Sequence, residues 1–344
     1  MNLERPAMTR YTPPFTLDYA MLGKVAEIAE RLGRWREASR DALQPQLRRN
    51  HRIRSVQASL AIEQNTLTLE QVTAVLDGKP VLGLPREIQE VKNAFDAYDA
   101  LPTWDPTRLD DLCAAHGLLM HGLADDAGGL RQGGVGIYRG ERLLHMAPPA
   151  NQLPRLLRDL LGWLAQTEAH PLIASSAVHY ELEFIHPFSD GNGRIGRLWQ
   201  TLILSRWQPM LAYLPVETVI QRRQDDYYRA LGEADRASDC SGFIRFMLEA
   251  IDDALQQALE AGGMDGVAEA LVKAPVKTLV KGRINTGDAL LAVLTTHPGA
   301  TLAEAAAHLG KSVSAIERAA RRLREDGRLR YVGPQKGGHW EVMG

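Results

Sequence analysis

The feature that most constrains this chain is the stretch HPFSDGNGRIGR, residues 186–197, which leads directly into a helical pattern. The helix is predicted by apolar residues that recur on one face: Ile195, Leu198, Trp199, Leu202, Ile203 and Trp207. The residues just before them lie at a helix N-terminus, where backbone N–H groups without helical partners and the helix dipole favour an anion. The fold must therefore place a polar, glycine-containing loop at the start of a buried helix.

The residue types in this loop favour a phosphate ligand. Gly191 and Gly193 allow the backbone to approach a bound group closely. Arg194 and Arg197 lie in the first turns of the helix, where a cation opposes the dipole by about 0.3–1 kcal/mol. A bound polyanion would reverse the sign of that effect. The interpretation that needs no ligand is an ordinary loop in which Asp190 caps the helix and the arginines are solvated.

The whole stretch resembles the signature of the Fic (filamentation induced by cAMP) family, H-x-F-x-D/E-G-N-G-R-x-x-R. Every fixed position is matched: His186, Phe188, Asp190, Gly191, Asn192, Gly193, Arg194 and Arg197. The resemblance implies an all-α Fic fold with a small β-hairpin flap. It also implies a protein adenylyltransferase, an enzyme that transfers AMP from ATP to a Ser, Thr or Tyr hydroxyl of a target protein or of itself.

The resemblance assigns roles to the polar residues that match the signature. A neutral histidine can accept the proton of the incoming hydroxyl, so His186 is the expected general base. Asp190 is the expected Mg²⁺ ligand, because a carboxylate oxygen suits that cation. The nucleotide is expected to contact the loop glycines, the asparagine and the two arginines, with a tyrosine lining the base pocket: Gly191, Asn192, Gly193, Arg194, Arg197 and Tyr228.

A second motif lies upstream, in SVQASLAIEQN, residues 55–65. Ser59 and Glu63 are four residues apart and share one helix face. Taken alone, Glu63 is a surface carboxylate near a helix end. The sequence resembles the S/T-x-x-x-E-G/N inhibitory helix of Fic proteins, which implies that Glu63 pairs with Arg197 and holds the enzyme inactive. Gln64 departs from the Gly or Asn of that motif. Asn65 and Thr66 are expected to end this helix and cap the next one.

One hairpin is predicted within 135–149, VGIYRGERLLHMAPP, because apolar residues flank a turn-like Arg-Gly-Glu. It could be an ordinary hairpin at the edge of a helical domain. By resemblance it is the Fic flap, which holds the target segment by strand pairing. The flap residues are then Val135, Gly136, Ile137 and Tyr138.

Length and composition bound the remaining possibilities. A chain of 344 residues accommodates one large and one small domain, and a net charge of −2 gives no overall indication of nucleic acid. Two cysteines are too few for a disulfide framework, and no apolar run or leader suggests a membrane span or export. We therefore expect a cytoplasmic protein that does not bind membranes. The expected regions are a helical part with the inhibitory helix at 1–100, a catalytic core at 101–260, a linker at 261–284 and a small domain at 285–344.

The small domain is predicted to be winged-helix-like, from three helical patterns followed by a hairpin. Its expected recognition helix carries Arg318, Arg321, Arg322 and Arg324, interrupted by Glu317, Glu325 and Asp326. DNA binding and a docking or dimer-supporting role both stay open. The alternative function is a DNA-binding transcriptional regulator that uses the Fic part as a nucleotide sensor. The resemblance also implies a homo-oligomer, and it leaves open other donors and the reverse removal of AMP.

Overall fold

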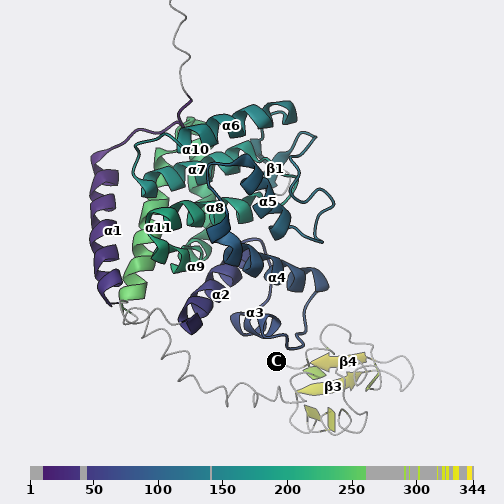
Figure 1. Ribbon diagram of the computed structural model, residues 1–344. Helices are drawn as coiled ribbons and strands as arrows, with labels where there is room; N and C mark the ends of the chain where they lie inside the picture. The colour runs from purple at the N-terminus through teal and green to yellow at the C-terminus, as the bar shows by residue number, and fades with distance from the viewer. Residues whose placement is uncertain are drawn as a thin grey trace, which may run out of the picture. The chain divides into compact units, whose positions relative to one another are not determined.

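The computed structural model describes residues 11–38, 45–139 and 142–260. Toward the C-terminus it describes residues 290–291, 294, 301–302, 316, 320–321, 323–324, 328–332 and 339–342. The chain divides into two compact units, residues 1–269 and 270–344. Figure 1 shows the first unit as a stack of helices with one short hairpin. The predicted helical class of this unit is confirmed.

The helices of the first unit are α1 (Tyr19–Ala38), α2 (Pro45–Ile62), α3 (Leu69–Leu76), α4 (Pro85–Ala100), α5 (Leu109–Leu119), α6 (Leu153–Leu164), α7 (Pro171–Ile185), α8 (Asn192–Trp207), α9 (Val216–Arg222), α10 (Gln224–Ala237) and α11 (Ser241–Glu260). Among the described residues, short 3₁₀ segments lie between some of these helices: η1 (Leu101–Thr103), η2 (Ala150–Gln152) and η3 (Pro209–Tyr213). Within the described part of the chain, none of the helices has the length and apolar character that crossing a membrane requires.

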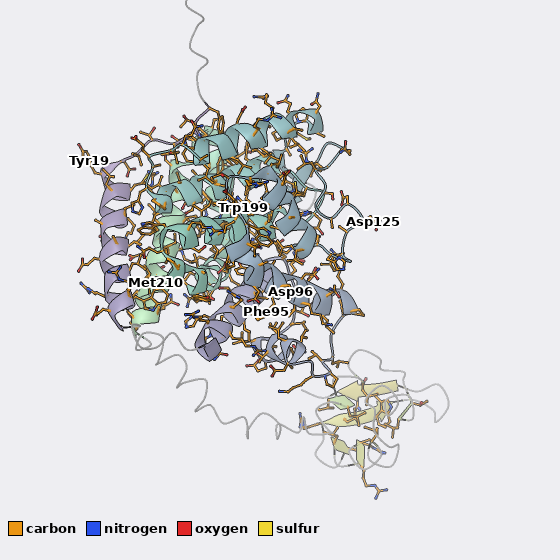
Figure 2. All side chains as sticks on the ribbon, viewed as in Figure 1. Tyr19, Phe95, Asp96, Asp125, Trp199 and Met210 are labelled. Atoms are coloured by element: carbon orange, nitrogen blue, oxygen red, sulfur yellow. The ribbon has the colours of Figure 1, made fainter. Side chains whose placement is uncertain are left out.

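Helices α7 and α8 pack against each other and form the centre of the unit (Figure 1). The predicted apolar face of α8 is buried, and Trp199 is fully inaccessible, with its indole N–H donating to the Pro106 carbonyl at 3.1 Å. Figure 2 shows Trp199 inside the helical unit, whereas Tyr19 projects from the outer side of α1. Polar residues of α8 are buried too, including Arg194 and Arg197. Both predicted phosphate-binding arginines therefore lie in the protein interior.

The other helices cover this central pair in two groups. Helix α1 packs on α11, which packs on α7, and their apolar side chains form one core cluster. Helices α2 to α6 contribute to a second cluster that includes Phe188 of the loop between α7 and α8. The loop is thus anchored in a core made by helices far from it in the sequence.

One predicted helix cap is wrong. Helix α3 is capped by Thr68, whose hydroxyl accepts from the Gln71 N–H at 3.3 Å, while the Gln71 side chain accepts from the Thr68 N–H at 2.9 Å. This reciprocal pair is a capping box. Asn65 is instead buried against α4, where its side-chain N–H₂ donates to the Glu87 carbonyl at 3.2 Å. The local pattern predicted that Asn65 caps α3, but its side chain instead forms a tertiary contact with α4.

The first unit contains a hairpin within the range 135–149. Strands β1 (Gly136–Arg139) and β2 (Arg142–Met146) pair antiparallel, with an irregular register between Ile137 and Tyr138. The turn residues 140–141 lie outside the described residues.

The second unit contains the other predicted hairpin. Strands β3 (Leu329–Val332) and β4 (His339–Val342) pair antiparallel. A small core includes Leu290, Leu294, Ile316, Leu323 and Trp340. Arg321 and Arg324 are exposed. The remaining residues of the expected recognition surface, Arg318, Arg322, Glu317, Glu325 and Asp326, and the expected linker at 261–284, lie outside the described residues.

Candidate phosphate-binding site

The loop between α7 and α8 reverses the chain through two left-handed residues. His186 ends α7 with φ 49° and ψ 61°, and Gly191 precedes α8 with φ 79°. The buried Asn192 side chain closes the loop: its carbonyl oxygen accepts from the Phe188 N–H at 3.0 Å and its N–H₂ donates to the Phe188 carbonyl at 2.9 Å. Asn192 therefore shapes the loop rather than pointing into solvent.

His116 of α5 contacts two residues of the loop, Phe188 and Asp190. Its ring is stacked on fully buried Phe188, with 3.6 Å between ring centroids and 5° between planes. The Gly128 N–H donates to His116 Nδ1 at 3.0 Å, so Nε2 carries the hydrogen that faces the Asp190 carbonyl at 2.9 Å. Burial is the main cause that lowers the pKa of His116, which keeps the ring neutral. The sequence pattern gave His116 no role.

Arg131 joins the loop to the hairpin. Its guanidinium is buried and donates to four carbonyls, those of His186 at 2.7 Å, Gly133 at 2.6 Å, Pro148 at 2.6 Å and Ile185 at 3.3 Å. Its own backbone N–H donates to the Pro187 carbonyl at 3.0 Å. The five donors of a guanidinium are well suited to such a junction. Arg131 lies in a glycine-rich segment whose local pattern indicates only turns, so the sequence did not identify it.

His186 is half-buried at the end of α7 and has the character of a base. Burial is the main cause that lowers its pKa; Glu183 opposes this shift, and the Arg131 guanidinium and His145 add to it. The imidazole is therefore neutral at neutral pH. Nδ1 faces the Glu183 carbonyl at 3.4 Å, which places the ring hydrogen on Nδ1 and the lone pair on Nε2.

Both predicted glycines lie in close contact with side chains. A Cβ on Gly191 would lie 2.7 Å from the Met120 sulfur, and the positive φ of Gly191 disfavours any side chain. A Cβ on Gly193 would collide with the Glu63 carboxylate and lie 3.0 Å from Arg197 Nη1. The backbone at Gly193 is thus approached by a carboxylate of the protein itself.

The structure brings the upstream motif and the loop together. Arg197 Nη2 donates to Glu63 Oε1 at 2.7 Å and to the Ser59 carbonyl at 3.1 Å, and Nε donates to Ser59 Oγ at 3.0 Å. Burial alone would lower the pKa of Arg197, but the neighbouring carboxylate of Glu63 and other acidic groups raise it overall. The Arg197 side chain is 1% exposed and that of Glu63 34%, so the pair is closed on the arginine side and open on the carboxylate side.

Asp190 is held by two arginines. Its Oδ1 accepts from the Gly191 N–H at 2.6 Å and from Arg194 Nη2 at 3.1 Å, and its Oδ2 accepts from Arg86 Nη2 at 3.1 Å. Glu90 of α4 lies 3.5 Å from Arg194 Nη1. Helix α4 therefore reaches the loop through Arg86 and Glu90, which no local pattern identified because they lie about a hundred positions upstream. In the alternative interpretation Asp190 caps α8; the structure puts Gly191 at that position instead.

The geometry at Asp190 fits a magnesium ion bound together with phosphates. The Asp190 side chain is 48% exposed. Among the described residues no group of three or more His, Cys, Asp or Glu side chains could enclose a metal. Mg²⁺ commonly binds through one or two carboxylates and completes its shell with water and substrate phosphate. A single accessible carboxylate at a helix start suits that mode of binding.

The remaining predicted site residues lie around this centre. Tyr228 of α10 is 43% exposed, and its hydroxyl accepts from Gln224 Nε2 at 3.4 Å. Gln224 Nε2 also donates to the Ile62 carbonyl at 2.9 Å, which connects α10 to the residue before Glu63.

In the hairpin, the Val135 carbonyl accepts from the Ala147 N–H at 3.1 Å. His145 of β2 contacts the Phe184 carbonyl at 2.8 Å and Asp235 Oδ1 at 3.0 Å, which fixes β2 to α7 and α10. The side chains of Ile137 and Tyr138 lie outside the described part.

Comparison with known proteins places these features in one class. Residues 106–204 match the Fic/DOC family, a range that contains the whole α7–α8 loop. A crystal structure of a Fic family protein from Desulfovibrio desulfuricans is 47% identical and covers 97% of this chain and 99% of its own, with a TM-score of 0.71. Fold and loop thus define a helical domain of the Fic/DOC type. The chain belongs to the Fic family.

More distant relatives carry the name of an activity. A protein adenylyltransferase Fic of Nematostella vectensis is 30% identical over 205 residues, which is 55% of this chain and 44% of that protein. A protein adenylyltransferase of Caenorhabditis elegans is 27% identical over 307 residues, which is 84% of this chain and 54% of that protein. The chain thus spans about half the length of these relatives.

Proposed function

We propose that this protein is an adenylyltransferase that transfers AMP from ATP to a Ser, Thr or Tyr hydroxyl of a target protein and of itself. The observation that carries the proposal is the complete loop, with neutral His186 at the end of α7 and two buried arginines at the start of α8. The adenylyltransferase relatives support the same reaction class.

Each residue has a defined task in this reaction. His186 Nε2 accepts the proton of the target hydroxyl, whose oxygen forms a bond to the α-phosphorus of ATP while the bond to pyrophosphate breaks. The N–H groups at the start of α8 hold phosphate oxygens, and Arg194 and Arg197 neutralise the negative charge. Asp190 would hold Mg²⁺, which when bound supplies further charge neutralisation at the phosphates. Asp190 must leave Arg86 for that purpose.

The Glu63–Arg197 contact supports autoinhibition as the resting state. Ser59 and Glu63 engage Nε and Nη2 of Arg197, so these two donors are not available to a terminal phosphate. The Glu63 carboxylate also lies against Gly193, at the backbone that a phosphate would approach. Moving the carboxylate away releases both groups together.

The flap and the base pocket complete the proposal. The outer edge of β1 would pair with the target segment, with Val135, Gly136, Ile137 and Tyr138 as its contact residues. Anchoring of β2 by His145 supports this role, because a docking edge must be fixed relative to His186. Tyr228 would line the pocket for the base, and its partner Gln224 also contacts the carbonyl of Ile62, the residue before Glu63.

For the second unit we propose a winged-helix-like domain that contacts protein, in a cytoplasmic homo-oligomer. The β3–β4 hairpin is the observation that supports the wing. The alternative is a DNA-binding regulator with a nucleotide-sensing Fic part, which exposed Arg321 and Arg324 would favour. A salt-dependent, sequence-selective gel shift by the full chain would establish that alternative, and its absence would retain the protein contact.

The test compares wild type, Glu63→Gly and His186→Ala with Mg²⁺ and ATP labelled at the α- or the γ-phosphate, followed by intact mass. We expect the mass of one added AMP, with the α-label retained. The rate of modification should be roughly tenfold higher or more in Glu63→Gly than in wild type, since losing about 1.4 kcal/mol of inhibition changes a rate tenfold. His186→Ala should lose transfer and keep ATP binding. Glu70→Gly, an exposed glutamate on α3, is the matched control and should behave as wild type.

Three results would contradict parts of this proposal. Retention of the γ-label would identify phosphate transfer rather than AMP transfer. Equal labelling of wild type and Glu63→Gly would remove the inhibitory role of Glu63. No mass gain in any variant, despite measurable ATP binding, would favour the nucleotide-sensing regulator or a different donor.

A further inference from the structure

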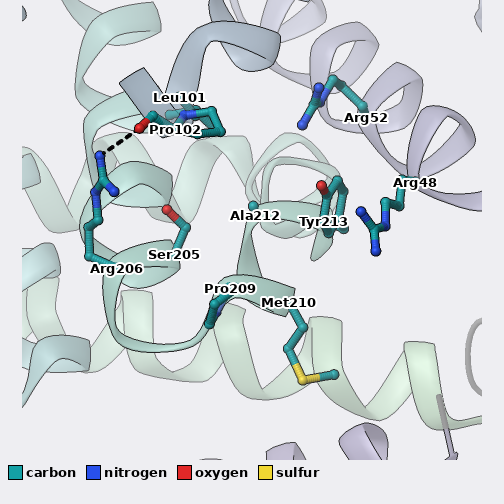
Figure 3. Close-up of a pocket in the computed structure, with 10 residues that line it drawn as sticks. All are labelled: Arg48, Arg52, Leu101, Pro102, Ser205, Arg206, Pro209, Met210, Ala212 and Tyr213. Carbon is teal, nitrogen blue, oxygen red and sulfur yellow. Dashed lines mark hydrogen bonds between the residues drawn. The ribbon is translucent and has the colours of Figure 1, made fainter. Parts of the chain in front are cut away.

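A cavity with arginines in a largely apolar lining lies outside the α7–α8 loop. It has a volume of about 300 Å³ and is formed where α2, η1, the end of α8 and η3 meet (Figure 3). None of its lining residues belongs to the loop or to the inhibitory motif. This volume is at the lower end of the range for small-molecule sites.

The cavity is strongly cationic. Figure 3 shows Arg48 and Arg52 beside Tyr213 on one side of Ala212, and Arg206 beside Ser205 on the other. The guanidinium carbons of Arg48 and Arg52 lie 5.6 and 5.4 Å from the centroid of the Tyr213 ring. No lining residue is acidic.

The only carboxylate that pairs with these arginines within the described ranges is that of Asp99, which contacts Arg52 and is 67% exposed. Arg48 forms no ion pair with any described residue, and Arg206 donates to the carbonyls of Pro102, at 3.0 Å, and Trp104. The cavity therefore has an excess of positive charge that the described chain does not neutralise.

Arg52 has a buried hydrogen-bond donor for which the described residues provide no acceptor. It is 9% exposed, and its Nε atom is buried with no hydrogen-bond partner in the described part of the chain. A buried guanidinium donor without an acceptor lowers the free energy of unfolding, because it has lost its hydrogen bonds to water and forms none in the protein. The Nε atom has no surface open to the cavity, so an anion there would contact the terminal nitrogens of Arg52.

The arrangement selects a particular kind of anion. Guanidinium groups match phosphate oxygens in planar, paired hydrogen bonds better than ammonium groups do. Arginines on both sides of the cavity can each engage one anionic group, and Met210 and Leu101 contribute apolar surface to its lining.

We propose that this cavity binds a small molecule that carries two linked phosphate groups. The two phosphates contact Arg48 with Arg52 on one side and Arg206 with Ser205 on the other. The site is separate from the transfer reaction, and its existence does not depend on the proposed adenylyltransferase activity.

The test is titration calorimetry of the full chain with methylenediphosphonate, a diphosphate that is not hydrolysed, in metal-free buffer. Wild type should show a saturable site that is weakened at least about tenfold in Arg48→Gln/Arg206→Gln. The matched control is Arg155→Gln/Arg158→Gln, which removes two exposed arginines of α6 and should bind as wild type does. Arg48→Gln alone, at an exposed residue, should weaken the site by about threefold and does not disturb the Arg206 contacts.

Circular dichroism of each variant establishes that it is folded. Unchanged affinity in Arg48→Gln and in the double variant would place the anion elsewhere, including the α7–α8 loop, and would overturn the proposal. Equal weakening in the α6 control would show a general charge effect and would overturn it as well. The absence of saturable binding to wild type at millimolar concentration has the same consequence.

Discussion

Gln64 is the residue at which this chain departs from the inhibitory motif, and its backbone explains the usual preference for Gly or Asn. It has φ 68°, in the left-handed region. The Asn65 N–H donates to the Leu60 carbonyl at 3.1 Å and the Gln64 N–H to the Ala61 carbonyl at 3.0 Å. These two bonds form a Schellman motif, which requires a left-handed residue after the helix end. Glutamine adopts this conformation at a cost that glycine avoids.

Gln64→Gly should therefore stabilise the first unit by up to about 1 kcal/mol, since removal of the left-handed strain exceeds the added flexibility of the unfolded chain. The matched control is Gln57→Gly within α2, which should destabilise by about 1 kcal/mol because glycine is unfavourable inside a helix. Urea unfolding followed by tryptophan fluorescence measures both. A loss of stability in Gln64→Gly would show that the glutamine side chain makes a compensating contact.

The residues of the site were predictable to different degrees for a physical reason. His186, Asp190 and the arginines lie within one continuous stretch, so their spacing alone identified them. His116 and Arg131 act through hydrogen bonds to backbone carbonyls 74 and 55 positions away. A backbone carbonyl has no residue identity, so no sequence motif records such a contact.

At the scale of elements, the end of α2 is held on α4 through Asn65. Its side-chain N–H₂ donates to the Glu87 carbonyl at 3.2 Å and to Glu90 Oε2 at 2.9 Å, and its oxygen accepts from the Leu67 N–H at 3.1 Å. Glu90 also lies 3.5 Å from Arg194. The contact that positions Glu63 is therefore linked to the first arginine of the loop as well as to the second.

Asn65→Ala should cost about 2 kcal/mol, because it leaves buried polar groups without partners. It should also increase self-modification with AMP, since the end of α2 is no longer fixed and Glu63 leaves Arg197 more often. Asn93→Ala is the matched control: Asn93 is buried in α4 and donates to the carbonyls of Leu119 and His121 at 3.1 and 2.8 Å. It should lose similar stability without gaining activity.

Intact mass and urea unfolding on the same preparations measure both effects. If Asn93→Ala gains as much activity as Asn65→Ala, general loosening of the fold releases the enzyme. If neither gains activity, Asn65 has a structural role only.

Element positions were more predictable than the contacts between elements. Apolar spacing predicted α8 because this helix buries one continuous apolar face. The cap of α3 was placed wrongly because two polar residues compete at that position, and contact with α4 decides between them. The packing of α2 and α4 around the loop depends on side chains more than twenty positions apart, which periodicity does not record.

At the scale of the whole first unit, Glu181 links the chain's N-terminal segment to the central helix α7. Burial is the main cause that raises the pKa of this carboxyl to about 7, and a hydrogen bond with Tyr11 partly offsets it. The same segment is tied down by the Cys240 N–H, which donates to the Pro14 carbonyl at 2.7 Å. A carboxyl that is 5% exposed in the centre of the fold makes the stability of the unit depend on pH.

The sign follows from the raised pKa. The folded protein holds the Glu181 proton up to about pH 7, whereas the unfolded chain releases it near pH 4.5. The contribution of this group to stability is therefore complete below about pH 4.5 and is lost as the pH rises through 7, by roughly 3 kcal/mol in total. Glu181→Gln, which stays neutral, should remove this part of the pH dependence.

Urea unfolding of wild type and Glu181→Gln between pH 4.5 and pH 8 tests this prediction through the difference between the two proteins, in which other titrating groups cancel. That difference should shift by roughly 3 kcal/mol in favour of Glu181→Gln as the pH rises. Glu233→Gln, at an exposed position of α10, should keep a constant difference from wild type. Parallel curves for wild type and Glu181→Gln would mean that Glu181 ionises in the folded protein as it does in the unfolded chain. The pH dependence would then have to come from other buried groups. One such group is Glu217, because burial also raises its pKa.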